Sequence, residues 1–201
     1  MVTRRADATY LAAKASVEAT IGPRDGLAVQ RNDGTMGEPL GWIGGINRLA
    51  WACQADHFIG LNDDVICHPG WVDALLAPLA DPSIGITGFP PAFGRYNATT
   101  GRSYPVSDGE QPDYIEGWCF AMRTADAKRF GPYDASFPAA FYYDDVDLCL
   151  RLRAAGLGLA VVRPGLVDHI GNATFNDPAE TAAMERAHLM NWSVMVRRYT
   201  A

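Results

Sequence analysis

Three clusters of polar side chains in this sequence have the residue types and spacing to carry chemistry. The first is Leu61-Asn62-Asp63-Asp64-Val65, in which two carboxylates and an amide follow an apolar segment, His57–Leu61, expected to be a strand. Carboxylates at the rim of an α/β sheet can hold Mg2+ or Mn2+, while water and diphosphate oxygens take the ion's other positions. A turn with a capping Asp gives the same pattern. Local sequence leaves both interpretations open.

The second cluster is Tyr142-Tyr143-Asp144-Asp145-Val146-Asp147-Leu148-Cys149, which is followed by Arg151 and Arg153. Its acidic side chains repel one another, so a metal, a basic partner or the positive amino end of a helix must offset their charge. The alternative is a capped helix whose acids pair with Arg151 or another neighbour. An EF-hand is excluded, because the glycine and the distant glutamate of that loop are absent.

The third cluster is Asp168-His169-Ile170-Gly171, which follows a strand-like segment and a Pro-Gly turn. A neutral His169 ring can ligate a metal through one nitrogen, while Asp168 or a carbonyl orients the other. Taken alone, such a histidine is more often a surface or core residue. His57, His68 and His188 have no comparable context and are predicted to be structural or solvated.

The elements that must position these clusters alternate between helix and strand, which predicts an α/β domain. Helices are expected over Asp7–Thr20, Ile43–Ala55, Trp71–Leu79 and Asp145–Ala155, and a last one capped by Asp177 with Pro178 at its first position. Strands are expected over Gly26–Gln30, His57–Leu61, Ile84–Thr87, Tyr114–Arg123 and Gly158–Val162. The opening strand is expected to be shortened to Met1–Thr3. Residues 89–112 are predicted to form a long loop that borders a substrate site.

Composition excludes several classes of protein. The 201 residues are 48% hydrophobic and 20% charged, as expected for one globular domain. A net charge of -6 argues against nonspecific nucleic-acid binding. Without a ~20-residue apolar span or a signal-peptide pattern, a cytoplasmic protein is expected. The four scattered cysteines suit the core better than a zinc site or a disulfide scaffold, and N-x-S/T triplets at Asn97, Asn172 and Asn191 are expected to be unused.

In this order, the clusters resemble the inverting family 2 glycosyltransferases of the GT-A fold, especially the rhamnosyltransferase-like branch. The resemblance covers roughly Pro39 to Phe175. Leu40–Asn47 resembles N-L-G-F-A-G-G-x-N, Leu61–Val65 the L-N-P-D-x version of the DxD motif, Gly131–Asp134 G-x-F-D, and Phe141–Arg151 F-x-Y-E-D-x-D-L-C-x-R. Tyr114–Arg123 is similar to the strand beside the acceptor site, Asn32–Thr35 to D-N-x-S, and His169 to the late histidine.

This resemblance implies a single Rossmann-like GT-A domain over residues 1–201, with a mostly parallel central sheet flanked by helices. Residues 1–90 would form the nucleotide-sugar half, and residues 91–201 the acceptor half and the C-terminal helix. The implied reaction moves a hexosyl or deoxyhexosyl group from a nucleotide-sugar donor to a glycan or another hydroxyl-bearing acceptor by inverting single displacement. The sequence carries no signal for an oligomeric state.

The resemblance also assigns roles to individual residues. Asp64 and His169 would hold the divalent cation, Mn2+ or Mg2+, and Asp145 would be the general base. The donor would be bound by Asn62, Asp63, Asp33, Gly41 and Asn47. The acceptor would be bound by Glu116, Trp118, Tyr143 and Asp144, where Trp118 and Tyr143 either stack on a sugar or belong to the core.

Two other functions fit the same clusters. A noncatalytic nucleotide- or carbohydrate-binding domain could keep this fold and lose turnover together with its first strand, whose end contacts the nucleotide base in the family. A missing or disordered base pocket would favour this alternative. A metal-dependent phosphohydrolase could use the same Asp clusters. It would release phosphate without an acceptor.

Overall fold

A computed structural model describes residues 1–3, 7–32, 35, 40–90, 93–97, 99–100, 102–105, 112–138, 142–163, 165–171 and 178–200. The helices are α1 (Ala8–Thr20), α2 (Gly41–Ala52), α3 (Trp71–Leu76), α4 (Thr124–Phe130), α5 (Asp144–Ala154) and α6 (Pro178–Tyr199), with a 3-10 helix η1 at Ala77–Ala80. The strands are β1 (Val2–Thr3), β2 (Gln30–Arg31), β3 (His57–Leu61), β4 (Val65–Cys67), β5 (Ile84–Gly88), β6 (Phe93–Asn97), β7 (Arg102–Pro105), β8 (Cys119–Arg123), β9 (Gly158–Val161) and β10 (Val167–His169).

The central sheet has the strand order β3-β8-β5-β9. β5 and β9 are parallel, whereas β8 runs antiparallel to both of its neighbours, so β3, β5 and β9 share one direction. Three small sheets surround it: the parallel pair β1-β2, the antiparallel pair β10-β4 and the hairpin β6-β7. Because three of the four central strands share one direction, the mixed α/β architecture with a mostly parallel sheet is confirmed.

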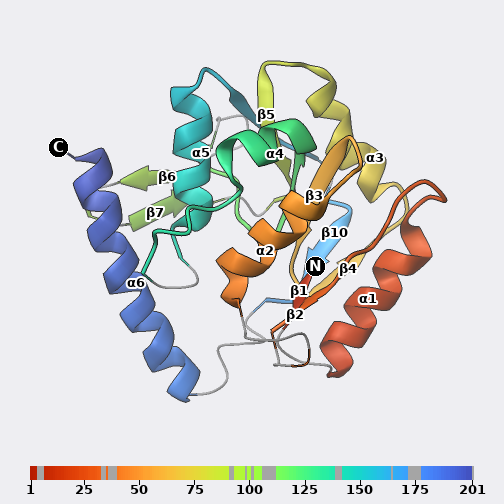
Figure 1. The fold of residues 1–201 in the computed structure, drawn as a ribbon, viewed down its shortest axis with the longest axis horizontal. Helices are drawn as coiled ribbons and strands as arrows, with labels where there is room; N and C mark the ends of the chain where they lie inside the picture. Colours follow the sequence, from red (N-terminus) through yellow and green to blue (C-terminus); the bar gives the residue numbers. More distant parts are fainter. Residues whose placement is uncertain are drawn as a thin grey trace.

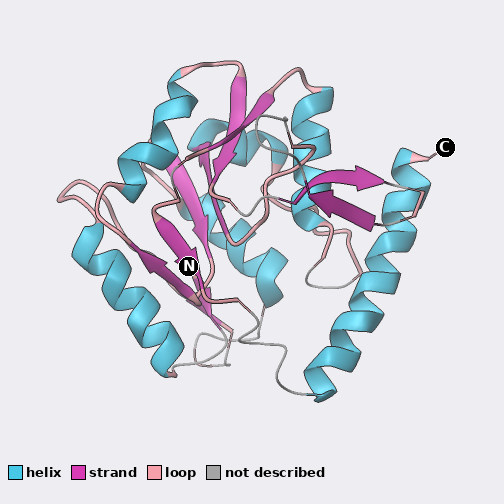
Figure 2. Ribbon diagram, turned by 180° about the vertical axis from the view of Figure 1, so that it is seen from behind, coloured by secondary structure: helices cyan, strands magenta, loops and turns pink. Residues whose placement is uncertain are grey.

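Helices cover the sheet on both faces, as Figures 1 and 2 show from opposite sides. Side chains on a strand alternate between the two faces, and β8 displays this directly. Phe120 and Met122 belong to one buried apolar cluster, with residues of α2, α4 and α5, whereas Cys119 and Ala121 belong to a second cluster, with residues of α1 and α3. The domain thus has two cores, one on each side of the same strand.

Local sequence explains the best-predicted elements. The Asp7 carboxylate accepts a hydrogen bond from the Tyr10 amide at 3.0 Å and so caps α1, which buries Tyr10, Ala13 and Val17 on one face. In β3, Gly60 lies under the Phe120 ring, which a Cβ at position 60 would meet at 2.2 Å. β3 can pair with β8 at this register because position 60 has no side chain.

Several expectations about the elements were wrong. The strand expected over Gly26–Gln30 is only β2, and the one expected from Tyr114 begins at Cys119. The loop expected over residues 89–112 contains the hairpin β6-β7, and α4, β4 and β10 were not expected. β4 and β10 have three residues each, too few to show a period in the sequence. The expected cap Asp177 lies outside the described residues, although α6 does begin at Pro178.

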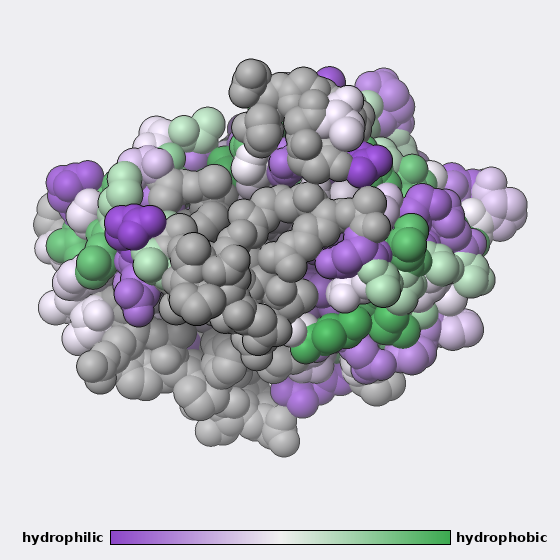
Figure 3. Space-filling view, turned by 90° about the horizontal axis from the view of Figure 1, so that it is seen from below, coloured by the Kyte–Doolittle hydropathy of each residue, from purple (hydrophilic) through white to green (hydrophobic). Residues whose placement is uncertain are grey.

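The described surface mixes hydrophilic and hydrophobic side chains, as the view from below shows (Figure 3). The most exposed large apolar side chains among the described residues are Leu11 on α1, Trp51 on α2, Ile170 after β10 and Leu189 on α6, so they lie on four different elements or turns. Cys67, Cys119 and Cys149 are buried, in keeping with the core role expected for most cysteines. Among the described residues, no helix combines the length and hydropathy needed to cross a bilayer.

Candidate active site

The first predicted pair, Asp64 and His169, is brought together by two short strands. Asn62, Asp63 and Asp64 follow the end of β3, as expected, and lead into β4. β4 pairs with β10 so that His169 lies opposite Val65, and the Ile170 amide donates to the Asp64 carbonyl at 2.9 Å. As a result, His169 Nε2 lies 3.2 Å from Asp64 Oδ1.

This pair fits a divalent cation. Asp64 is buried, and among the described residues no hydrogen bond of good geometry reaches its Oδ1 atom, despite the short distance to His169. A buried oxygen left without a donor is unfavourable unless another group satisfies it. Carboxylate oxygen and imidazole nitrogen are both metal ligands. Within the described part of the chain, no group of three or more Asp, Glu, His or Cys side chains could hold a metal. Oxygens of a bound substrate and water would therefore complete the coordination shell of a cation held by Asp64 and His169.

Trp118 fixes the orientation of the His169 ring. The two rings are stacked, with centroids 4.8 Å apart and planes 8° from parallel. The Asn62 backbone amide donates a hydrogen bond to the Trp118 backbone carbonyl at 2.9 Å, and this bond attaches Trp118 to the end of β3. Asp168, expected as a possible partner of His169, instead lies 2.7 Å from His68 Nε2, because neighbouring strand residues point to opposite faces. Trp118 is buried, so a contact with the acceptor stays a prediction.

Asp145 is held by the segment that precedes β8. The Gly117 amide donates to Asp145 Oδ2 at 3.2 Å, and the Val146 amide donates to Oδ1 at 2.8 Å. A Cβ at position 117 would lie 2.7 Å from the Tyr133 hydroxyl, so only glycine fits here without a shift. Burial raises the pKa of Asp145, although these amide hydrogen bonds favour the ionised form. Gly117 and Trp118 therefore connect Asp145 to the Asp64–His169 pair.

Asp144 lies beside Asp145 but in a drier environment. It is 4% exposed, and its Oδ2 atom accepts a hydrogen bond from Trp42 Nε1 at 3.1 Å. Burial raises the pKa of Asp144 well above its usual value, and the neighbouring charge of Asp145 raises it further. The two adjacent carboxyl groups thus differ in exposure and in partners.

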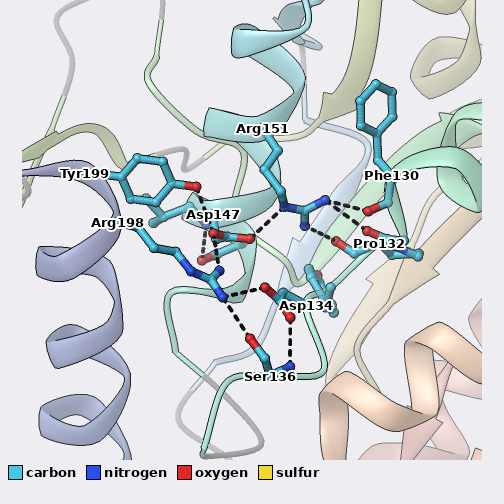
Figure 4. Close-up of polar contacts among 12 residues, drawn as sticks. Phe130, Pro132, Asp134, Ser136, Asp147, Arg151, Arg198 and Tyr199 are labelled. Carbon is cyan, nitrogen blue, oxygen red and sulfur yellow. Dashed lines mark hydrogen bonds and ion pairs between the residues drawn. The ribbon is translucent and has the colours of Figure 1, made fainter. Parts of the chain in front are cut away.

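Asp147 is the centre of a buried charge network, which Figure 4 shows. The carboxylate is fully buried and lies between Arg151 Nε at 2.7 Å, Arg198 Nη1 at 2.9 Å and the Tyr199 hydroxyl at 2.8 Å. Arg198 also pairs with Asp134 at 2.6 Å. The interpretation of Arg151 as a partner of the acidic cluster is confirmed for Asp147. The network joins α6 to the first turns of α5.

Tyr142 and Tyr143, which precede α5, both have left-handed backbone conformations, with φ of 72° and 66°. The Tyr143 ring is buried against Tyr96 of β6, with centroids 5.7 Å apart, and its hydroxyl lies 3.2 Å from the ring nitrogens of His188. His188 was expected to be structural or solvated, and its contacts with Tyr142 and Tyr143 are structural ones. No sequence pattern marks these contacts, because α6 meets this turn only in the folded chain. An acceptor contact for Tyr143 stays a prediction.

The other predicted donor residues lie in varied surroundings. Asp63 is partly buried, and this burial raises the pKa of its carboxyl group, although a hydrogen bond from Thr3 acts in the opposite direction. Gly41 begins α2 with φ of 66°, and its carbonyl accepts from Asn32 Nδ2 at 2.9 Å. Asn47 makes a structural contact, because its amide donates to the Tyr133 carbonyl at 2.7 Å and accepts from the Tyr133 amide at 2.9 Å.

Two predicted residues add little to this picture. Asp33 lies outside the described residues. Glu116 is partly buried immediately before Gly117, on the segment that reaches Asp145. Binding roles for Asp63, Gly41, Asn47 and Glu116 stay predictions.

Parts of the chain are similar in sequence to mycobacterial proteins. An uncharacterised protein of Mycobacterium tuberculosis (strain ATCC 25618 / H37Rv) is 30% identical over 152 residues, which cover 71% of this chain and 58% of that protein. The pre-mycofactocin glycosyltransferase of the same strain is 28% identical over 133 residues, which cover 59% of this chain and 27% of that protein. The chain therefore spans little more than half of the first relative and about a quarter of the second. No protein-family model matches it.

The fold is similar to those of solved glycosyltransferases. A mannosyltransferase from Pyrobaculum calidifontis, in complex with GDP-Man and Mn2+, has a TM-score of 0.63 at 14% identity, covering 98% of this chain and 62% of that one. Glucosyl-3-phosphoglycerate synthase from Mycobacterium tuberculosis, in complex with phosphoglyceric acid, has a TM-score of 0.63 at 17% identity, covering 98% of this chain and 78% of that one. This chain has the GT-A glycosyltransferase fold expected from its sequence.

Proposed function

We propose that this chain carries the site of a metal-dependent inverting glycosyltransferase of the family 2 type, similar to its rhamnosyltransferase-like branch. The observation that carries the proposal is that two consecutive residues contact the candidate base and the candidate metal pair. Gly117 holds the Asp145 carboxylate, and Trp118 stacks on His169 beside Asp64. A candidate base and a candidate metal pair are thus fixed to one short segment, on a fold shared with nucleotide-sugar enzymes.

The donor side of the proposed site lies at the end of β3. Asp64 and His169 would hold the cation, with Asn62 and Asp63 next to the donor. Carboxylate oxygen suits both Mg2+ and Mn2+, whereas imidazole nitrogen favours the transition ion, so Mn2+ is the better match. When bound, the cation neutralises negative charge on the diphosphate leaving group. In this proposal residues 1–90 supply most of the donor half, and residues 91–201 supply the acceptor half and His169.

On the acceptor side, Asp145 takes the proton of the acceptor hydroxyl. The acceptor oxygen then forms a bond to the anomeric carbon from the face opposite the nucleotide, and the bond from that carbon to the diphosphate breaks. Burial raises the pKa of Asp145, which brings its basicity closer to neutral pH, where a general base works best. The Gly117 amide keeps the carboxylate oriented. Asp144, Tyr143 and Glu116 are proposed to contact the acceptor, a glycan or another hydroxyl-bearing molecule, and the reaction is proposed to be cytoplasmic.

The proposal is tested by a turnover assay with defined donors. The protein is incubated with Mn2+, a panel of UDP- and GDP-sugars and hydroxyl acceptors, and the anomeric configuration of the product is read by NMR. The expected result is acceptor-dependent release of nucleoside diphosphate and a product of inverted configuration. Retention of configuration overturns the inverting mechanism. Phosphate release without an acceptor supports a phosphohydrolase instead, and tight binding without release supports a noncatalytic domain.

A further inference from the structure

The turn before α5 has an unusual backbone. Tyr142 and Tyr143 are consecutive residues with φ of 72° and 66°, and they are the only described residues other than glycine with positive φ. This region is unfavourable for side chains with a Cβ, and bulky residues rarely adopt it. Such a conformation persists only where surrounding contacts enforce it, and it is common at active sites. The turn leads directly to Asp144 and Asp145.

Besides Tyr96 of β6, which packs on Tyr143, the contacts that support this conformation come from α6. Asn191 is fully buried, and its Nδ2 atom donates to the Tyr142 carbonyl at 3.0 Å. One turn earlier on the same helix, His188 contacts the Tyr143 hydroxyl and meets the Tyr142 ring edge to face, with centroids 5.8 Å apart. The carbonyl held by Asn191 belongs to the first of the two strained residues.

α6 also holds the chain on the other side of Asp145. Arg198 and Tyr199 donate to the Asp147 carboxylate, two residues beyond Asp145 (Figure 4). Figure 1 shows α6 along one side of the molecule, away from α1 at the other. The helix is therefore attached to the segment on both sides of the candidate base and fixes its position from outside the central sheet.

We propose that Asn191 is a positioning residue for Asp145: its hydrogen bond to the Tyr142 carbonyl holds the strained Tyr142–Tyr143 turn, and the turn sets where the Asp145 carboxylate meets the acceptor hydroxyl. The effect on turnover rests on the glycosyl transfer proposed above. The effect on the backbone does not. The buried Asn191 side chain also explains why its N-x-S triplet is unsuitable for glycosylation in the folded chain.

Asn191→Leu tests this proposal, because leucine fills a similar volume and cannot donate. Without the hydrogen bond the strained turn is expected to relax and displace Asp145, so turnover should fall by at least about tenfold. The Mn2+-dependent affinity for a nucleoside diphosphate should stay unchanged. Met195→Ala is the matched control. Met195 is fully buried one turn later on the same helix and belongs to the same apolar cluster as Tyr143, but its thioether cannot donate a hydrogen bond to the turn. Met195→Ala therefore removes packing alone, so it should lower the melting temperature and leave turnover within about threefold of the wild type.

A rescue separates positioning from general support of the fold. Glycine adopts positive φ without strain, so Tyr142→Gly removes the need for Asn191 to enforce the conformation. In the Tyr142→Gly background, Asn191→Leu is expected to cost less than about threefold in turnover, which a double-mutant cycle measures. An equal loss in both backgrounds overturns the proposal.

A crystal structure of Asn191→Leu gives a readout without activity. Return of Tyr142 to negative φ, with displacement of Asp145, supports the positioning role even if no donor is ever turned over. In that case the proposed function alone fails. An unchanged turn in the variant overturns the positioning role, whatever the activity of the wild-type protein. If Asn191→Leu does not fold, Asn191→Ser is measured in the same way, because its shorter side chain also fails to reach Tyr142.

Discussion

Replacement of Asp145 by asparagine separates the proposed chemistry from structure. The change keeps the size of the side chain and removes its basicity. A general base contributes ~100- to 10,000-fold to turnover, so kcat should fall by that factor in Asp145→Asn. Donor affinity should hardly change, because the described contacts of Asp145 are to Gly117 and Val146 and not to the Asp64–His169 pair.

The expected stability of this variant follows from the same contacts. Asparagine keeps one oxygen acceptor for two amide donors, and loss of a hydrogen bond to a charged group costs about 1.5–3 kcal/mol. Removal of a buried charge next to Asp144 offsets part of this cost, since burial and that neighbour both disfavour ionisation. The net change in the free energy of unfolding should therefore stay within about 2 kcal/mol.

Asp147→Asn provides the contrast. Asp147 is fully buried between Arg151, Arg198 and Tyr199, and removal of its charge takes away the carboxylate that Arg151 pairs with and leaves Arg198 paired with Asp134 alone. Breaking a buried pair in this way costs about 3–5 kcal/mol, so this variant should lose stability first. Asp144→Asn completes the set and reports whether the adjacent carboxyl is the true base.

The assays are steady-state turnover, calorimetry with a nucleoside diphosphate and Mn2+, and urea unfolding for each variant. Asp145→Asn with more than about a tenth of wild-type turnover would refute its role as base. If Asp144→Asn instead shows the large loss in kcat at unchanged donor affinity, the assignment moves by one residue. Loss of donor binding in all three variants would show that the cluster supports the site electrostatically, and the noncatalytic interpretation would be favoured.

Three further predictions test other parts of the site. Asp64→Ala should weaken Mn2+-dependent binding of a nucleoside diphosphate in calorimetry, whereas the same change at the exposed Asp56, just before β3, should not. If the wild-type protein binds the diphosphate equally well with Mn2+ and with chelator, Asp64 and His169 have no metal role. Trp118→Ala should weaken Mn2+ binding by about 10- to 100-fold, because the ring that stacks on His169 is lost. Trp118→Phe should retain most of the binding, because no acceptor among the described residues meets Trp118 Nε1. Similar losses in the two variants would exclude ring stacking as the cause. Since the folded state raises the pKa of Asp144 above 3.8, the native chain binds this proton more tightly than the unfolded one, and stability should fall as pH rises from about 4 through the raised pKa. Urea unfolding across pH should show a flatter profile for Asp144→Asn, and an unchanged profile would contradict this assignment.

The sequence by itself predicted the elements and clusters that depend on local signals. β3 matches its predicted bounds, and Asn62, Asp63 and Asp64 follow its end as expected. α1 and α6 begin where an N-cap or a helix-starting proline predicts. These features could be predicted because hydrophobic period, capping residues and turn residues act over a few neighbouring positions. The GT-A fold was expected from the resemblance of these clusters to family 2 glycosyltransferases, and the fold confirms it.

Only the tertiary structure decided which of these residues meet. His169 reaches Asp64 through the register of β4 and β10, strands too short to leave a periodic signal. Gly117 became a partner of Asp145 because a loop before β8 crosses the start of α5. Asn191, read in the sequence only as part of an N-x-S triplet, holds the Tyr142 carbonyl from the last helix. Such contacts depend on how distant segments pair and pack, and local sequence patterns carry no record of that geometry.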